Sequence, residues 1–545
     1  MFHVNYFILL IINQHSIRPG KKELDVKNPN QPTLKDAETE SGIISLAKGA
    51  VYINGFNLAF NPGLNQLGSG FTYTVYGYQE LLGDVISASA SNQNINVINL
   101  PEYVILDNLT KVNSGLTQRA TIRVTNTRSN RSSNSVYYEY AFMYALNNAC
   151  NNVLEVLPRV KFSGDSLTKR KTIEAWAYWW KGYAYSRIGS MYYAGILNNV
   201  PFKTNSHYVG HDTIIIEANK YLDLAAADLN SITNAADYTT IIKQLIPDFI
   251  QVGKGQAPTT TMWLHSINTM KARNLLVNKK VSAMTQADWN TILTLTSNGI
   301  NSTDYVFSLR TTALNGVLST TGNVTALSTT SSGTFRISER LIQEFKAGDK
   351  RLANNFALRS SPLLDQTGGL TFSTRWTLLD GGAAGGSTIP GTIVYSNKSA
   401  GNYELYVGPT YEENALMRAE ALIYTSQVDA GLALVDAVRT YQGAGLTAVS
   451  GTGLTQAQAV VELRRESRVA LIFRGVSYYN YRRWGITYDV AQGGGRTGAV
   501  VLTTAGVLNT NATINYNFLD YWDVTQDETE LNPPDAGSSP VVNPN

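Results

Sequence analysis

Apolar residues recur at three- and four-residue steps over long stretches of this chain, which is the spacing that places them on one face of an α-helix. The clearest stretches are residues 41–57, 137–157, 172–197, 213–232, 262–277, 411–424, 429–441 and 456–473. Each of them is expected to form an amphipathic helix that buries its apolar face. The chain is therefore predicted to be mainly α-helical.

Several of these helices are expected to pack as antiparallel pairs. Only the four residues TSQV separate the helix at 411–424 from the next one, and a connection this short makes the two helices neighbours. In the third predicted helix, small residues alternate with bulky aromatic ones, which lets helices approach closely, as they do in tetratricopeptide repeats. Trp179, Gly182 and Tyr185 keep the spacing of that repeat, although Lys181 stands where a leucine is usual.

Polar passages rich in Gly, Ser, Thr and Asn interrupt the helical pattern at residues 61–87, 309–334 and 368–388. The first is expected to be a loop followed by a short helix. The second is expected to form short strands and loops, because apolar residues still punctuate it. The last residues, 533–545, are rich in Pro and Ser and are expected to be frayed.

Charge and composition narrow the possible functions. Lys and Arg number 44 against 41 Asp and Glu, a net charge of +3 over 545 residues, whereas a nucleic-acid surface needs clustered cations. Tyrosine is abundant, with 31 residues beside 8 Trp. Aromatic rings stack on the apolar faces of sugars, and amides and hydroxyls bind sugar hydroxyls. The mixture is typical of a secreted binding surface, although most of the tyrosines are expected to be half-buried helix and strand residues.

The sequence predicts no metal or cofactor site. The only cysteine, Cys150, lies in an apolar run, so an intrachain disulfide is impossible and a cysteine-based zinc site is not expected. His207 and His211 are four residues apart but lack the helical context and the intervening Glu of a metalloprotease motif. The glycine-rich run at 493–498 lacks the Lys-Ser/Thr ending of a phosphate-binding loop.

Three carboxylates, Asp84, Glu420 and Glu466, are the candidates for an enzyme. A glycosidase needs two carboxylates that face each other across a cleft, roughly 5 to 10 Å apart. Glu420 lies among small residues of a predicted helix, where a structural ion pair with a residue such as Arg439 is the expected role. No catalytic residue is predicted.

Several motifs occur together and in a fixed order. They are INTMKARNLLV followed by DW, EFKAGDKRL, ENALMRAEALIY, AVRTYQGAGL and RRESRVALIFRGVSYYNYRRWG. In this order the chain resembles the SusD/RagB family of surface nutrient-binding lipoproteins of Bacteroidetes. The resemblance extends from about residue 21 to residue 522, and the last motif is the most specific.

The resemblance implies one SusD-like unit over 21–532, with an N-terminal helical half at about 41–310 and a C-terminal half at about 335–530. In this fold, degenerate tetratricopeptide-type helix pairs form a superhelical platform that supports an irregular, loop-rich lobe with short strands. The implied function is non-catalytic binding of an oligosaccharide and its delivery to a SusC-like TonB-dependent transporter in the outer membrane. A peptide-binding RagB-like protein or a protein-interaction scaffold is the alternative, and a glycan-active enzyme is a further one.

The resemblance also suggests where a ligand would bind, because members of the family place binding aromatics in the loop after the first helix. The candidates there are Phe71, Tyr73, Tyr76 and Tyr78, and Trp376 in the glycine-rich passage at 368–388 is a further one. Packing in the core is the competing interpretation for each of these rings.

The last motif departs from the family pattern at three positions. Ala470 and Arg474 each replace a usual Glu, and Asn480 replaces a usual Asp. Such acids normally form buried ion pairs, and a buried charge left without its partner is destabilising. We therefore expect the partners of these positions to have changed as well.

The first 20 residues resemble a displaced secretory signal. The apolar run Tyr6 to Ile12 is too short to span a membrane, and no Lys or Arg precedes it. The following residues, KKELDVKNPNQPT, resemble the start of mature members of the family, but Gly20 stands where a lipid-bearing cysteine is expected. Contact with the membrane is predicted only through a lipid anchor, if one is present.

Overall fold

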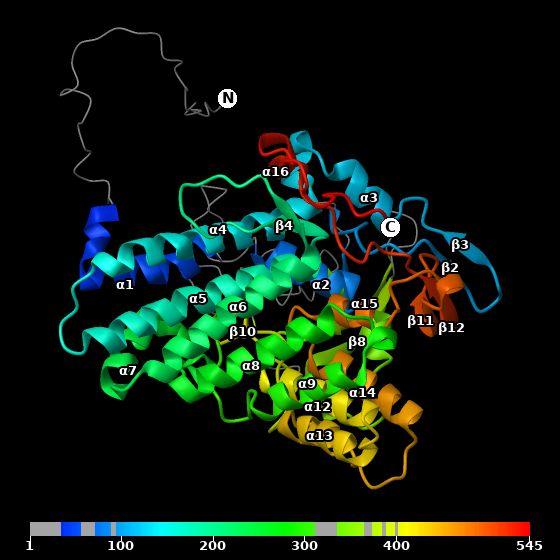
Figure 1. The fold of residues 1–545 in the computed structure, drawn as a ribbon. Helices are drawn as coiled ribbons and strands as arrows, with labels where there is room; N and C mark the ends of the chain where they lie inside the picture. The colour runs from blue at the N-terminus through cyan, green and yellow to red at the C-terminus, as the bar shows by residue number, and fades with distance from the viewer. Residues whose placement is uncertain are drawn as a thin grey trace, which may run out of the picture.

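The structure is a computed structural model that describes residues 34–55, 71–88, 94–310, 335–364, 373–383, 388–397 and 402–545. Long helices dominate these residues. Four of them, α4 (Ser135–Val156), α5 (Ser166–Met191), α6 (His211–Ser231) and α8 (Thr260–Val277), follow one another as packed neighbours. Figure 1 shows them lying side by side in one layer. The sequence predicted all four, and the structure confirms a mainly α-helical fold.

Small residues let α5 and α6 pack closely. A Cβ atom at Gly182 would lie 2.8 Å from Cγ of Leu222 and 3.1 Å from the carbonyl oxygen of Ala218. Such distances are below normal contact, so any larger residue would force the two helices apart. The large rings of α5 fill the space on its other sides: Trp176, Trp179 and Trp180 are fully buried.

A second group of helices comes from the later part of the chain. It contains α12 (Tyr411–Tyr424), α13 (Val428–Tyr441) and α14 (Gln456–Ala470), and α9 (Gln286–Ser297) packs on α12. Gly431 permits the close contact of α13 with α12, because its Cβ would lie 2.7 Å from the carbonyl oxygen of Ala419. The predicted antiparallel pair is thus formed. A large hydrophobic core runs through both groups of helices, and a smaller separate cluster joins α9 to α8 and α12.

Shorter helices complete the helical part of the chain. They are α1 (Glu40–Gly49), α2 (Gly77–Leu82), α3 (Gln118–Thr125), α7 (Ala235–Leu245), α10 (Glu339–Ile342), α11 (Lys350–Asn355), α15 (Ser477–Arg483) and α16 (Gln526–Leu531). The helical pattern in the sequence identified α1 but not α3 or α7. α7 has a clear apolar face, with Tyr238, Ile241, Ile242 and Leu245 buried.

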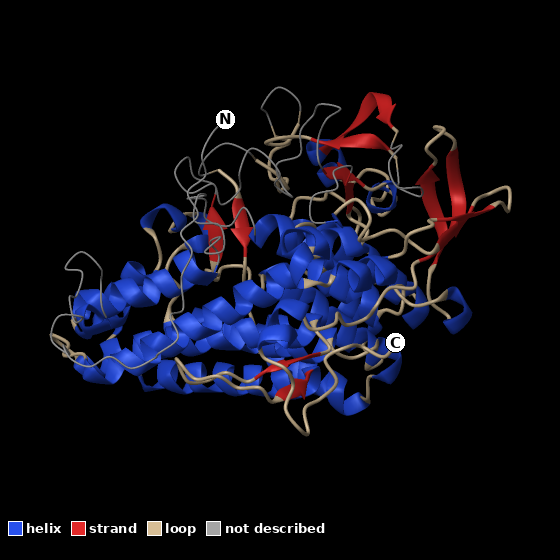
Figure 2. Cartoon of the chain, turned by 90° about the horizontal axis from the view of Figure 1, so that it is seen from above, coloured by secondary structure: helices blue, strands red, loops and turns tan. Residues whose placement is uncertain are grey.

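Strands occur in short pieces that join distant segments. The four-stranded sheet has the order β11 (Arg496–Leu502), β12 (Leu508–Asn515), β2 (Tyr103–Ile105), β3 (Lys111–Asn113), and all its pairs are antiparallel. The two-stranded sheets pair β1 (Ile86–Ala88) with β7 (Phe335–Ile337), β4 (Ala194–Ile196) with β5 (Tyr208–Gly210), β6 (Ser308–Arg310) with β10 (Glu404–Tyr406), and β8 (Phe356–Leu363) with β9 (Thr374–Leu378). Figure 2 shows most strands beside the helical layer rather than within it.

The C-terminal residues 533–545 are held against the rest of the chain, so the expectation of a frayed tail is wrong. Asn543 is fully buried, and its side-chain amide donates to the Asp520 carboxylate at 2.9 Å and to the Tyr521 carbonyl at 2.7 Å. Further back, the amide of Ser539 donates to the carbonyl of Tyr208 in β5 at 2.8 Å. A Pro-rich composition disfavours helix and central strand, but it does not prevent an extended segment from docking through its polar groups.

Candidate functional site

Two of the predicted ligand-binding tyrosines lie in the core. Tyr76 ends a π-helical turn before α2 and is only 2% exposed, and Tyr78 on α2 is 1% exposed. The Tyr76 hydroxyl donates to the carbonyl of Tyr406 at 2.8 Å, and the Tyr78 ring meets Trp522 edge to face at 5.6 Å. Neither ring has a free face for a ligand. The structure therefore assigns both to core packing, because the turn points them inward.

The other predicted aromatics have different outcomes. The side chains of Phe71 and Tyr73 lie outside the described residues, so their role in binding stays a prediction. Trp376 is on β9, opposite Leu358 of β8, and is only partly buried. Its indole N–H is buried and makes no hydrogen bond with any described residue. Trp376 stays a candidate for ligand contact.

A pocket of about 520 Å³ lies between α4, the loop after β4 and α16. Its size falls within the usual range of small-ligand sites, about 300 to 1,000 Å³. One face of α4 forms an apolar wall with Tyr137, Ala141, Tyr144 and Ala145. These residues recur at helical spacing, so the sequence pattern places them on one face. Their pattern alone could not show that α16, more than 380 residues later, leaves this face half open.

Polar groups surround this apolar wall. The amides of Asn148, Asn198, Asn205 and Asn532 line the pocket together with the hydroxyls of Thr204 and Thr525. Its charged groups are balanced in number, with Arg131 and Lys203 against Asp527 and Glu528. The Arg131 guanidinium lies 2.5 Å from Oδ1 of Asp527. The pocket therefore offers hydrogen bonds on several sides without an excess of one charge.

Tyr144 fixes the pocket wall to the β4 strand. Its hydroxyl donates to the carbonyl of Ile196 at 2.9 Å and accepts from the amide of the same residue at 2.6 Å. The neighbouring Tyr140 ring lies 4.5 Å from the Tyr144 ring. The wall is thus a rigid element, which favours precise recognition over an adaptable contact.

Solved structures with the same architecture were found, whereas no family model and no curated protein matches the sequence. B. fragilis NanU superposes with a TM-score of 0.55 at 11% identity, over 95% of this chain and 100% of that chain. A SusD superfamily protein from Bacteroides vulgatus gives 0.52 at 13% identity, over 92% and 98%. A SusD homolog from Bacteroides thetaiotaomicron gives 0.51 at 13% identity, over 89% and 97%. The chain has the SusD-like fold. The predicted fold is confirmed, and at these identities the likeness is one of fold.

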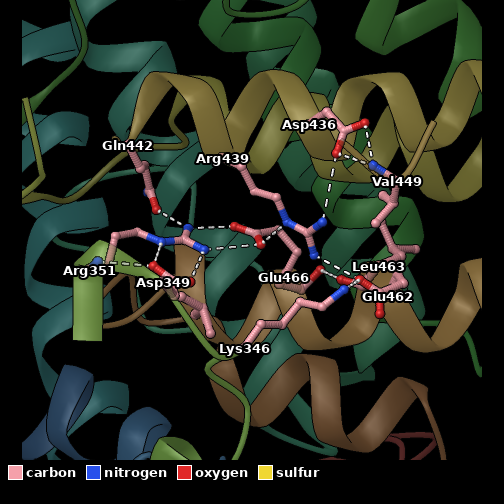
Figure 3. Close-up of polar contacts among 12 residues, drawn as sticks. Lys346, Asp349, Arg351, Asp436, Arg439, Gln442, Val449, Glu462, Leu463 and Glu466 are labelled. Carbon is pink, nitrogen blue, oxygen red and sulfur yellow. Dashed lines mark hydrogen bonds and ion pairs between the residues drawn. The ribbon is translucent and has the colours of Figure 1, made fainter. Parts of the chain in front are cut away.

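The carboxylates that were candidates for catalysis are ion-paired inside the protein. Glu466 accepts from Arg351 and Arg439, as Figure 3 shows. Glu420 pairs with Arg483 at 2.6 Å, so the prediction of a structural ion pair is confirmed but the expected partner, Arg439, is wrong. All three carboxylates, Asp84 included, are buried in such pairs and do not face one another across an open cleft.

The three positions at which the last motif departs from the resembled pattern each have a partner in this chain, and whether these partners have changed stays a prediction. Arg474 is buried 3.6 Å from Glu412, and its guanidinium lies 4.3 Å from the centre of the Tyr406 ring. Burial would lower the pKa of Arg474, but Glu412 and the surrounding tyrosines outweigh it and raise the pKa. Asn480 accepts from Nε of Arg483 at 2.9 Å. At the third position, Ala470 contributes its backbone carbonyl, which accepts from Gln442 at 3.0 Å.

The two histidines have separate partners. His207 lies 2.9 Å from the Asp535 carboxylate in the C-terminal segment, and His211 stacks on Tyr521 with ring centres 4.0 Å apart. Nowhere in the described ranges do three or more His, Cys, Asp or Glu side chains gather so that they could hold a metal ion. None of the helices in the described part of the chain has both the length and the apolar character needed to cross a membrane.

A second pocket, of about 540 Å³, lies beside the end of β12. Its polar groups are largely engaged within the protein. Arg119 donates to the carbonyl of Asn517 at 2.9 Å, Lys280 lies 3.4 Å from the centre of the Tyr488 ring, and Asp520 accepts from Asn543. Asn205 and Asn532 in the pocket between α4 and α16 are engaged as well. That pocket differs because it contains two buried atoms, the Tyr140 hydroxyl oxygen and Oδ2 of Asp527, that form no hydrogen bond of standard geometry with the described residues.

Proposed function

We propose that this protein binds a nutrient at the outer surface of the cell and delivers it to a SusC-like TonB-dependent transporter in the outer membrane. The nutrient is an oligosaccharide, and the protein does not change it chemically. The observation that carries the proposal is the SusD-like fold, which superposes over nine-tenths or more of this chain and nearly all of the B. fragilis and B. vulgatus chains. The ordered motifs of the sequence support it independently.

The buried ion pairs support the non-catalytic part of the proposal. Catalytic carboxylates must reach the bond that they cleave, whereas Asp84, Glu420 and Glu466 are each held by arginine side chains in the interior. Incubation of the purified protein with the glycans that it binds should leave them intact. Release of reducing ends above the level of a buffer control would contradict the proposal.

The nature of the nutrient is tested by binding to two panels of ligands. A panel of neutral oligosaccharides and a panel of short peptides would be compared by isothermal titration calorimetry with the full chain. We expect binding from the first panel. If the protein binds only peptides, a peptide-binding RagB-like function is favoured instead. If it binds neither oligosaccharides nor peptides, the proposal that it captures a nutrient of either class is refuted.

Delivery requires a physical partner. The transporter should co-purify with this protein from detergent-solubilised outer membranes, and the complex should persist through size-exclusion chromatography. The mass and amino-terminal sequence of the membrane-extracted protein test the anchor, because a lipid would require a cysteine in the native chain where this sequence has Gly20. Recovery of the protein only from soluble fractions, without a transporter, would contradict surface delivery.

A further inference from the structure

The pocket between α4 and α16 contains two buried polar atoms that lack a hydrogen bond of standard geometry within the described residues. Tyr140 and Asp527 both line it and both are at least 95% buried. The Tyr140 hydroxyl and Oδ2 of Asp527 form no hydrogen bond that meets standard geometry with any of the described residues. A buried polar group without a partner costs free energy, and native structures rarely contain one without a reason. Two of them in one pocket point to a ligand that supplies the missing bonds.

The chemistry of the two groups defines what that ligand must offer. A carboxylate oxygen only accepts hydrogen bonds, whereas a tyrosine hydroxyl both donates and accepts. A ligand rich in hydroxyl groups satisfies both, because each hydroxyl is itself a donor and an acceptor. The pocket has no excess of positive charge that would favour a carboxylate or phosphate, because Arg131 and Lys203 are balanced by Asp527 and Glu528. The pairing of Asp527 with Arg131 removes the net charge that would favour a cation.

The apolar wall adds a second requirement. Tyr137, Ala141, Tyr144 and Ala145 lie on the same face of α4 and all line the pocket. The small side chains of the two alanines leave room on this face for a flat apolar group beside the rings. Sugar rings have such a face of C–H groups beside their hydroxyls, and amide side chains around the wall match those hydroxyls.

We infer that this pocket is a binding site for a neutral sugar residue, with Ala141 and Ala145 as its floor and with Tyr140 and Asp527 as hydroxyl-binding groups. The inference rests on the proposed function, because it assigns a place and a ligand class to the nutrient. It does not involve the predicted aromatics Phe71, Tyr73 or Trp376. It also explains why α4 has alanines where a closed core would place larger residues.

Two substitutions test the pocket without removing a bond that holds the fold. Tyr140→Phe deletes a hydroxyl that forms no hydrogen bond of standard geometry with the described residues and interacts with the neighbouring Tyr144 hydroxyl. Its binding of neutral linear trisaccharides of glucose, xylose, mannose or galactose should weaken about five- to tenfold, the usual effect of one lost hydrogen bond. Its thermal midpoint should stay the same or rise. Ala145→Trp fills the space above the floor and should reduce trisaccharide binding at least tenfold.

Matched controls separate pocket effects from effects on the fold. Tyr238→Phe also deletes one buried hydroxyl, but that hydroxyl donates to the carbonyl of Pro258 at 2.8 Å. It should lower the thermal midpoint and leave binding unchanged. Thr240→Trp places the same bulky ring on an exposed position of α7 and should change neither binding nor stability.

The outcomes distinguish the inference from the function on which it rests. If the wild-type chain binds a trisaccharide and neither Tyr140→Phe nor Ala145→Trp weakens it, the pocket assignment is wrong and the proposed function stands. If the wild-type chain binds only short alanine-rich peptides, the sugar assignment is wrong while nutrient capture stands. If it binds members of neither panel, both are refuted. A loss of binding in the two pocket variants alone supports the inference.

Discussion

Arg340 and Asp84 form a fully buried ion pair that joins α10 to the end of α2, 256 residues apart in the chain. The guanidinium donates from Nε to Oδ2 at 2.9 Å and from a terminal nitrogen to Oδ1 at 2.8 Å. The hydroxyls of Ser338 and Tyr516 donate to the same carboxylate at 3.0 and 2.8 Å. Burial alone would raise the pKa of Asp84, but the charges and hydrogen bonds of Arg340 outweigh it and lower the pKa.

Asp84→Asn should therefore destabilise the protein strongly. The neutral amide leaves the buried Arg340 without a counter-charge, which typically costs about 3 to 5 kcal/mol. Urea unfolding followed by circular dichroism measures the change. Asp223→Asn is the matched control, because Asp223 pairs with Lys271 while its side chain is 60% exposed, and such pairs contribute only about 0 to 1 kcal/mol. Equal effects of the two substitutions would contradict the structural role of Asp84.

Two carboxylates on α14 differ in burial, so their substitutions should differ in their effect on stability. Glu466 of α14 accepts from Arg351 at 2.6 Å and from Arg439 at 2.8 Å, and it is almost completely buried. Glu462, one turn earlier, accepts from Arg439 and Lys346, as Figure 3 shows, and its side chain is 15% exposed. Glu466→Gln should lower the free energy of unfolding by several kcal/mol, and Glu462→Gln by less than half as much. A larger decrease in the free energy of unfolding for Glu462→Gln than for Glu466→Gln would show that Glu466 is not the most important carboxylate of this ion-pair network.

The helices could be predicted from the sequence because their signal is local. The predicted helix at 411–424 coincides with α12, and those at 137–157 and 213–232 differ from α4 and α6 by two residues or fewer at each end. The sheet of β2, β3, β11 and β12 has no such signal. Its pairing joins residues 103–113 to residues 496–515, and neither segment contains information about its partner.

The candidate site was harder to predict, because the identity of an aromatic residue does not determine its burial. Tyr76 and Tyr78 follow a polar loop, yet both lie in the core. Tyr137 and Tyr144 show the regular spacing of a packed helix, yet they line a pocket. Whether an aromatic side chain is buried or lines a pocket depends on segments that are distant in the sequence. Such segments cover the rings of Tyr76 and Tyr78 but leave the face of α4 with Tyr137 and Tyr144 partly open.

The Glu80 carboxyl predicts a pH dependence of stability. It is buried where α2 meets the turn before α15, and it accepts from the amide of Gly475 at 3.1 Å. Burial raises its pKa from 4.5 to about 7, against the opposing hydrogen bonds of Ser477 and Gly475. A raised pKa means that the folded state binds the proton more tightly than the unfolded state. The contribution to stability is therefore complete below about pH 4.5 and is lost as the pH rises through 7.

Glu80→Gln should remove this dependence, because the amide resembles the protonated carboxyl at every pH. The variant should gain stability relative to the wild-type protein between pH 4 and pH 8, by roughly 3 kcal/mol from the shift in pKa. Urea unfolding at both pH values measures this gain. Glu155→Gln, which changes a half-exposed carboxyl on α4, should show no comparable gain. Parallel pH profiles of wild-type and Glu80→Gln protein would show that Glu80 does not titrate in this range.

Because of Lys181, we expect stability to depend on pH with the opposite sign. It occupies the position where the tetratricopeptide pattern has a leucine, and its ammonium group is fully buried. Its Nζ donates to Oδ1 of Asn147 at 2.7 Å and lies 4.5 Å from the centre of the Tyr221 ring. Burial lowers the pKa of Lys181 from 10.5 to about 7, although Cys150 and Glu217 oppose the shift. Between pH 7 and 10.5 the unfolded chain therefore holds a proton that the folded chain has released.

Stability should consequently rise with pH across this window, and Lys181→Met should abolish that rise. The comparison uses slopes, because the methionine also leaves the amide oxygen of Asn147 without its donor, a cost that does not depend on pH. The free energy of unfolding of the wild-type protein relative to the variant should increase by roughly 2 kcal/mol between pH 7 and pH 9, at about 1.4 kcal/mol for each pH unit. Lys243→Met changes an exposed lysine on α7 and serves as the control, with a slope close to that of the wild-type protein. Identical slopes for the wild-type and Lys181→Met proteins would mean that the buried amine keeps its proton, held by its three asparagine oxygens.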